Sequence, residues 1–189
     1  SAASDVYKRQ LYMLFIDLST FFPKLDRQVV RYAELVHGLP QEVCDLVALI
    51  YGEATDRDDC VECRYDSEAG LGDPFKNYMG ALMGCVLSPD RAKLVLNTVV
   101  AAIALHCKGV RLAGYCPNEL HDTWLRIAQV MFADDWLGLH ESVGDLRDAW
   151  EVWSTWAPIA GCKLGVKVKL KTAVTGVRWE GGRPMSVAD

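Results

Sequence analysis

Residues 130–139, with the sequence VMFADDWLGL, place two adjacent aspartates between two apolar runs. Apolar runs favour strands and Asp is a common turn residue, so residues 124–140 predict a β-hairpin with Asp134 and Asp135 at its tip. Two carboxylates about 4 Å apart repel each other by roughly 4 kcal/mol at an effective dielectric of about 20. A solvated turn tolerates that repulsion, whereas at a cation site a bound metal neutralises it. A third carboxylate from elsewhere in the chain would decide between these alternatives.

The composition is that of an ordinary soluble globular domain. The chain has 189 residues, of which 51% are hydrophobic and 24% charged, and this length suits one domain or one and a piece. It contains no signal-peptide pattern and no apolar run near the roughly 20 residues of a membrane span. We therefore expect an intracellular protein, nuclear or cytoplasmic, that is not secreted and has no membrane partner. The net charge of −5 fits an independent nucleic-acid-binding module poorly, but it allows an acidic active site whose metal ions offset the charge.

The chain has seven cysteines. Their odd number and irregular spacing argue against a disulfide framework and for a reducing compartment. Cys60 and Cys63 form one CxxC pair, which would make a zinc site with Cys116 and His121. No second closely spaced pair supports that alternative.

Periodicity and turn residues predict a mixed chain. Residues 1–10 share no periodicity with the rest and are interpreted as a non-native leader, which leaves 11–189 as the domain. Helices are expected from Asp26 to 37, from 40 to 51, from 88 to 107 and from 142 to 161. Strands are expected at 11–18, 109–115, 124–132, 136–140 and 163–172, with a hairpin or irregular insertion at 55–74. Strands mixed with long helices indicate the α+β class.

Two side-chain patterns fall within these elements. Trp150, Trp153 and Trp156 lie three apart on the last helix, where packing against a sheet is favoured over ligand binding. In the last strand, strict alternation places Lys167, Lys169 and Lys171 on one side. Those lysines suit either an edge strand protected from aggregation or a strand beside a nucleic-acid backbone or pyrophosphate.

Asp17 supplies the third carboxylate. It lies near the end of the apolar run LYMLFIDL (11–18), which predicts a buried strand. If this strand and the 124–140 hairpin are neighbours in one antiparallel sheet, Asp17 and Asp134 converge on one point. Such a group of carboxylates suits a two-metal site, in which cations about 3.5–4 Å apart stabilise the attacking and leaving oxygens of phosphoryl transfer.

Four motifs in order carry a resemblance to a known family: FIDLSTFFPKLDR (15–27), GALMGCVLSPDRAKLVLN (80–97), FADD (132–135) and GCKLGVKVKLKT (161–172). Together they resemble the palm of reverse transcriptases, and among these the LINE-like non-LTR retroelements and group II introns. The resemblance covers about residues 11–179. It implies a polymerase palm with an antiparallel sheet packed against helices and part of the fingers. It also implies an RNA-directed DNA polymerase that uses two Mg²⁺ ions, or Mn²⁺, with an RNA template, a DNA primer and dNTPs as partners.

The resemblance also assigns roles to individual residues. The metal-site residues it implies are Asp17, Leu18, Asp134 and Asp135. Lys171 matches the lysine proposed to protonate the pyrophosphate leaving group, although Lys167 or Lys169 is an alternative because residues 161–171 are longer than usual. Phe22 matches the aromatic residue beneath the sugar of the incoming nucleotide. Gly84 matches the glycine that lets the backbone approach that nucleotide, with Met83 beside it.

Some positions depart from the family pattern. Met83 stands where the family usually has Gln, and TFFP (20–23) replaces the Lys-Ala-Phe-Asp of many LINE-like members, so a second Asp is absent. Asp17 comes almost at once, without the basic fingers region that precedes it in the family, and no thumb follows the palm. We therefore expect a palm-centred fragment that is nearly inactive by itself and whose oligomeric state is open.

Two other functions compete with the polymerase. An RNA-dependent RNA polymerase shares the palm, but it usually has Gly-Asp-Asp in the hairpin and a second Asp in the first motif. Here Ala133 precedes the aspartates and Phe22 occupies the first motif, which favours deoxynucleotides. A degenerate reverse-transcriptase-like scaffold that binds RNA or protein is favoured by Met83 and Pro23, and opposed by the intact aspartates.

Overall fold

The computed structural model describes residues 10–51, 62–64, 66–77, 79–81, 85–114, 123–165, 172–180 and 183–186. The chain forms two compact units. The first comprises Ser1–Ser19, Val99–Pro158 and Lys163–Asp189, and the second comprises Thr20–Thr98 and Ile159–Cys162. The helix α5 (Ser88–His106) contributes residues to both. Helices and antiparallel sheets are mixed throughout, in agreement with the expected α+β class.

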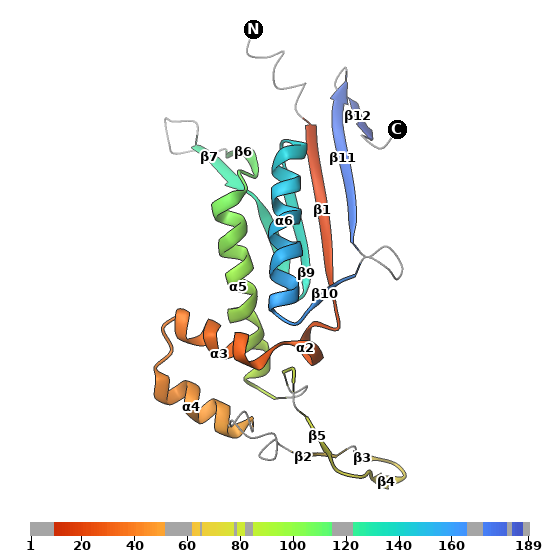
Figure 1. Cartoon of the computed structure of the whole chain (residues 1–189). Coiled ribbons are helices and arrows are strands. Elements are labelled where there is room, and N and C mark those ends of the chain that lie inside the picture. Colours follow the sequence, from red (N-terminus) through yellow and green to blue (C-terminus); the bar gives the residue numbers. More distant parts are fainter. Residues whose placement is uncertain are drawn as a thin grey trace. The chain divides into compact units, whose positions relative to one another are not determined.

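An antiparallel sheet forms the centre of the first unit (Figure 1). Its strands are β1 (Gln10–Ser19), β8 (Gln129–Phe132), β9 (Asp135–His140), β10 (Lys163–Leu164), β11 (Ala173–Glu180) and β12 (Arg183–Ser186). They follow the order β12-β11-β1-β9-β8, with β10 paired to the end of β1 beyond β11. The strand expected at 11–18 is therefore confirmed, and it is the central strand of the sheet.

One face of this sheet packs against α6 (Val143–Ile159). Leu14, Ile16 and Leu18 of β1 are buried, which follows from the alternation of side chains along a strand. On the same side, the rings of Trp136 in β9 and Trp153 in α6 meet edge to face with centroids 5.4 Å apart. The expectation that the tryptophan stripe packs against a sheet is thus confirmed for Trp153.

A second hairpin, β6 (Val110–Gly114) with β7 (Thr123–Ile127), belongs to the same unit. The single strand expected at 124–132 is wrong, because the chain leaves one sheet and enters another at Ala128. Gly109 lies against that point so closely that an added Cβ would come within 2.5 Å of the Ala128 Cα. The Ala128 carbonyl accepts a hydrogen bond from the Leu139 N–H at 2.9 Å, so this residue links β7 to the main sheet.

The second unit is mainly helical, with α2 (Phe21–Lys24), α3 (Arg27–Val36), α4 (Gln41–Ile50) and the N-terminal part of α5. The Asp26 carboxylate accepts hydrogen bonds from the backbone N–H groups of Gln28 and Val29, which confirms it as the cap of α3. Short strands pair β2 (Glu62–Cys63) with β5 (Phe75–Lys76) and β3 (Asp66–Ser67) with β4 (Gly70–Leu71). The hairpin expected in this region is therefore present in the described residues, whereas α2 was not predicted.

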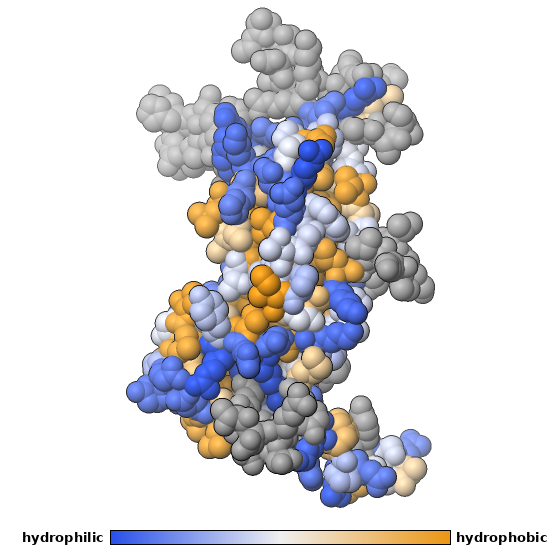
Figure 2. All heavy atoms as spheres, in the orientation of Figure 1, coloured by the Kyte–Doolittle hydropathy of each residue, from blue (hydrophilic) through white to orange (hydrophobic). Residues whose placement is uncertain are grey.

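Buried charge holds the helices of the second unit together. The Arg91 guanidinium of α5 lies 2.5 Å from the Glu34 carboxylate of α3, and it also stacks over the Tyr51 ring at 4.3 Å. Hydrophobic side chains remain at the surface over α3 and α4 (Figure 2), among them Val36 and Leu49. None of the described helices is long and apolar enough to span a bilayer.

Candidate active site

Asp17 and Asp135 face each other across two neighbouring strands. They are Cα partners in the antiparallel pairing of β1 with β9. Cross-strand partners point to the same face with Cβ atoms about 4.5–5.5 Å apart. The expectation that the strand of Asp17 adjoins the aspartate hairpin is confirmed. The Asp17 carbonyl accepts a hydrogen bond from the Gly165 N–H at 2.9 Å, so the backbone is fixed on the other edge of β1 as well.

Asp134 occupies the turn between β8 and β9. Phe132 and Asp135 form the last pair of this hairpin, which leaves Ala133 and Asp134 as the two turn residues. Ala133 has a φ of 53°, a left-handed conformation that costs a residue with a Cβ roughly 1–2 kcal/mol. Among the described non-glycine residues, positive φ occurs at Ala133 and at Thr20, which follows β1 directly. Backbone strain of this kind concentrates at functional sites, and here it lies close in sequence to the aspartates.

The aspartates lie at one end of the sheet face that α6 does not cover. Residues paired on this face include Phe15 with Leu137 in addition to the two aspartates. Phe15 and Phe132 are 39% and 82% exposed, so the face is apolar and open within the described part of its own unit. The result is a surface with hydrophobic side chains along the strands and carboxylates at the tip.

The carboxylates match the ligand chemistry of a hard divalent cation, which takes oxygen ligands. The carboxylate oxygens of Asp17, Asp134 and Asp135 do not all lie within 4.8 Å of one another. Among the described residues, the ligand atoms of Cys107, His140 and Asp145 do lie that close together. The Leu18 side chain is 2% exposed and apolar, so its backbone carbonyl is the part of that residue suited to a metal.

The cluster of Cys107, His140 and Asp145 was not predicted from the sequence. The Asp145 carboxylate accepts hydrogen bonds from the backbone N–H groups of Lys108 (2.7 Å) and Gly109 (3.1 Å), and it lies 2.9 Å from the His140 Nδ1. Burial raises the pKa of Asp145, but hydrogen bonds from His140, Lys108 and Gly109 outweigh it and hold that pKa below the usual range. Burial raises the pKa of the Cys107 thiol to about 12, so the thiol stays protonated. Because both Asp145 oxygens are already bonded, the cluster is a structural link between the residues directly after α5, the strand β9 and the helix α6.

The predicted nucleotide-binding residues belong to the second unit. Phe22 is half-buried, and its ring meets that of the buried Phe21 edge to face at 5.3 Å. The Phe22 carbonyl accepts a hydrogen bond from the Ala81 N–H at 2.7 Å. Gly80 packs so tightly there that an added Cβ would lie 2.3 Å from the Pro23 carbonyl oxygen. The segment that leads to Met83 and Gly84 thus lies against α2, which contains Phe22 and Pro23, although residues 83 and 84 themselves lie outside the described residues.

Comparisons with known proteins give matches among solved structures. No protein-family model and no curated protein sequence matches the chain. Apo telomerase from Candida tropicalis, truncated from its C-terminal domain, matches with a TM-score of 0.63 and 14% identity over 98% of this chain and 34% of that one. Telomerase from the same organism, in complex with a TWJ fragment of telomeric RNA, matches with a TM-score of 0.58 and 12% identity over 91% and 27%. The chain has a reverse-transcriptase-like fold. It spans about a third or less of the length of these neighbours.

The reverse-transcriptase-like fold brings some of the predicted residues together. Asp17 and Asp135 meet in register, with Asp134 beside them on the turn. Lys171 lies outside the described residues, as do Lys167 and Lys169. Of the cysteine and histidine residues in the zinc alternative, Cys63 is described and has a free thiol, whereas residues 60, 116 and 121 lie outside the described residues.

Proposed function

We propose that the chain is the palm-centred part of an RNA-directed DNA polymerase, which transfers nucleotides from dNTPs to a primer 3′ end. The observation that carries this proposal is the register of Asp17 opposite Asp135 in a reverse-transcriptase-like fold. Asp134 lies next to them on the turn in which Ala133 has a strained backbone. One of the neighbours is a telomerase in complex with RNA, which supports nucleic acid as the partner. The motif order further suggests a LINE-like or group II intron type.

The proposed cofactor is Mg²⁺, with Mn²⁺ able to replace it. Asp17, Asp134 and Asp135 would hold two ions, together with the Leu18 carbonyl. Such ions, when bound, stabilise the attacking and leaving oxygens of phosphoryl transfer. In the proposed reaction the primer 3′-hydroxyl loses its proton to water, its oxygen forms a bond to the α-phosphate, and the bond from that phosphate to pyrophosphate breaks. Lys171 is proposed to give a proton to the departing pyrophosphate.

Phe22 is the proposed determinant of sugar choice. A rigid ring beneath a deoxyribose leaves no space for a 2′-hydroxyl and so rejects ribonucleotides by steric conflict. Phe21 is fully buried, whereas its neighbour Phe22 is only half-buried. This difference supports a core role for the Phe21 ring and a ring at Phe22 that is available for contact with a nucleotide.

The five described cysteines are free thiols, which supports the proposal of a reducing, intracellular compartment.

One alternative function has its own observation in favour. Met83, in the position where the family usually has Gln, suits a catalytically inactive scaffold that binds RNA or protein.

Primer extension distinguishes the two functions. The assay uses the natural polypeptide that contains this chain, with an RNA template, a DNA primer, Mg²⁺ and either dNTPs or ribonucleotides. We expect Asp134→Asn to lower extension by about 10²-fold or more, the scale on which removal of an electrostatic stabiliser acts. Asp148→Asn, which removes an exposed carboxylate on α6, should leave it unchanged. Phe22→Val should raise the use of ribonucleotides relative to dNTPs.

The scaffold alternative predicts a different result in the same primer-extension assay. Under it, the wild-type protein would not extend the primer, or Asp134→Asn and Asp148→Asn would extend it equally well. Extension of RNA primers with ribonucleotides alone would favour an RNA polymerase instead.

A further inference from the structure

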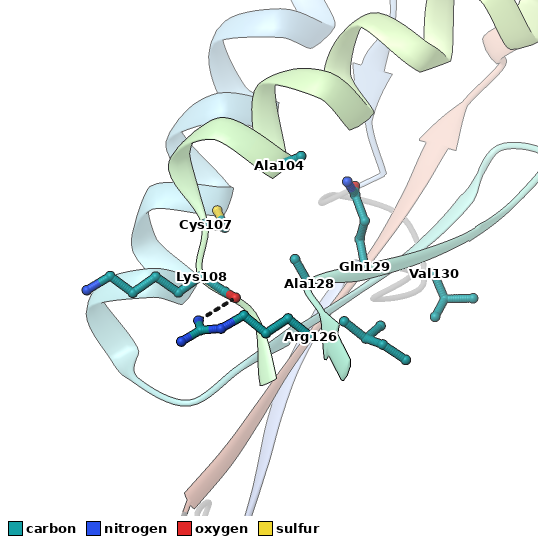
Figure 3. A pocket seen from close by; sticks show the side chains of 8 residues that line it. Ala104, Cys107, Lys108, Arg126, Ala128, Gln129 and Val130 are labelled. Atoms are coloured by element: carbon teal, nitrogen blue, oxygen red, sulfur yellow. Dashed lines mark hydrogen bonds between the residues drawn. The ribbon is translucent and has the colours of Figure 1, made fainter. Parts of the chain in front are cut away.

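A pocket of about 650 Å³ opens between the end of α5 and the strands β7 and β8 (Figure 3). Its walls are mainly aliphatic, from Ala104, Ile127 and Val130. Lys108 and Arg126 lie on its rim, and Figure 3 shows both side chains extending in the same direction, away from Val130. The Arg126 guanidinium donates a hydrogen bond to the Lys108 carbonyl at 3.2 Å, which fixes the arginine beside the lysine.

Positive charge gathers at this rim. Arg111 and Arg126 are Cα partners in the β6–β7 hairpin, so their side chains share a face. Directly opposed like charges destabilise a strand pair. The Glu141 carboxylate accepts a hydrogen bond from the Arg111 backbone N–H at 2.9 Å, but in the described part of the chain no carboxylate forms an ion pair with the side chains of Lys108, Arg111 or Arg126. This group of cations stands out in a chain whose net charge is −5.

The polar group in the pocket wall is already satisfied. The Gln129 amide donates a hydrogen bond to the Val100 carbonyl at 2.8 Å, and it accepts one from the Trp136 indole at 2.7 Å. Both ends of this side chain are therefore used within the protein. The pocket offers charge and apolar surface, but among the described lining side chains it offers no free amide or hydroxyl with which to read a base edge. Contacts of this kind position a nucleic acid without specifying its sequence.

We propose that Lys108, Arg111 and Arg126 bind the phosphate backbone of an RNA strand without regard to sequence. This inference rests on the proposed function for its choice of RNA as the occupant. Two cations on one hairpin and a third two residues before it suit charges that repeat along a strand better than they suit one small anion. The site differs from the aspartate site in its charge and in its residues.

The test measures the affinity of the 189-residue chain for a fluorescently labelled oligouridylate by anisotropy, at several KCl concentrations and without Mg²⁺ or dNTPs. Lys108→Gln and Arg126→Gln should each weaken binding at low salt by about threefold or more. Each should also lower the slope of log affinity against log salt by about 0.7 for every phosphate of a single strand that the variant no longer neutralises. Arg126→Lys should retain most of the affinity because it keeps the charge.

Lys93→Gln is the matched control, because Lys93 is an exposed lysine on α5 that pairs with Asp90. It should change neither affinity nor slope. If Arg126→Gln fails to fold because its bond to the Lys108 carbonyl is removed, Arg111→Gln carries the test, with the same expected decrease in affinity. Equal effects of Lys93→Gln and Lys108→Gln, no binding of oligouridylate at low salt, or its displacement by inorganic phosphate at constant ionic strength would each overturn the inference.

This experiment separates the RNA site from the polymerase proposal. In the natural polypeptide that contains this chain, Asp134→Asn should bind oligouridylate like the wild type while it fails to extend a primer. RNA binding that depends on Lys108 and Arg126, in a natural polypeptide that does not extend a primer, would support the site and refute the polymerase. Extension that depends on Asp134, together with RNA binding that does not depend on the basic residues, would support the polymerase and refute the RNA site.

Discussion

At the scale of single residues, Ala133 combines a strained backbone with a position next to the aspartates. Its φ of 53° is one that glycine adopts freely, and the chain has alanine there. The strain could not be read from the sequence, because alanine gives no signal of positive φ. The aspartates could be predicted, because charged pairs between apolar runs are conspicuous and Asp17 ends a strand-like run.

Ala133→Gly should therefore leave stability unchanged or raise it by up to about 1 kcal/mol, because relief of a left-handed conformation worth about 1–2 kcal/mol outweighs the greater chain entropy of glycine. Urea denaturation measures the free energy of unfolding. Ala101→Gly, at an exposed position within α5, is the control and should cost about 1 kcal/mol. Equal losses of stability from both variants would show that Ala133 is not strained.

At the scale of secondary-structure elements, local signals located most of the helices. The Asp26 cap and Gly38, with a φ of 86°, bound α3 as expected, and Gly161, with a φ of 77°, follows the end of α6. The division of the predicted 124–132 strand at Ala128 was missed, because it depends on the close approach of Gly109 from another part of the chain. The helix α2 was missed because it is short and contains Pro23.

The link made by Asp145 ties the start of α6 to β9 and to the residues after α5, and it should be sensitive to pH. The pKa of Asp145 is held below the usual range in the folded chain, whereas an unfolded Asp has a pKa of about 3.9. The ionised carboxylate therefore stabilises the fold fully above that unfolded value, and this contribution is lost as the pH falls through the lower folded pKa.

Asp145→Asn should lower the free energy of unfolding by about 1–3 kcal/mol at pH 7, the scale of hydrogen bonds to a buried charged group. The difference from the wild type should shrink as the pH is lowered below about 4. Denaturant titrations from neutral to acidic pH measure both effects. Asp148→Asn, on the exposed side of the same helix, should change stability by less than about 0.5 kcal/mol. A difference that stays constant with pH would rule out the ionised carboxylate as the stabilising species.

At the scale of the whole chain, the order of four motifs predicted a reverse-transcriptase-like fold that the structural neighbours support at 14% and 12% identity. Single motifs would not have been enough, because an Asp-Asp pair alone also suits an ordinary turn. The exposed apolar sheet face and the basic rim at Arg126 could not be predicted, since both depend on which strands pair. The polymerase proposal depends in the end on whether the carboxylates of β1 and of the β8–β9 turn share a cation.

Binding of Mn²⁺ to the 189-residue chain, followed by electron paramagnetic resonance, tests that claim most directly. Asp17→Asn, Asp134→Asn and Asp135→Asn should each weaken Mn²⁺ binding by about tenfold or more, equivalent to about 1.4 kcal/mol, because each removes a charged oxygen ligand. Asp148→Asn should bind Mn²⁺ like the wild type. If the three site variants bind Mn²⁺ as tightly as Asp148→Asn does, the aspartates do not form a shared metal site and the account is contradicted.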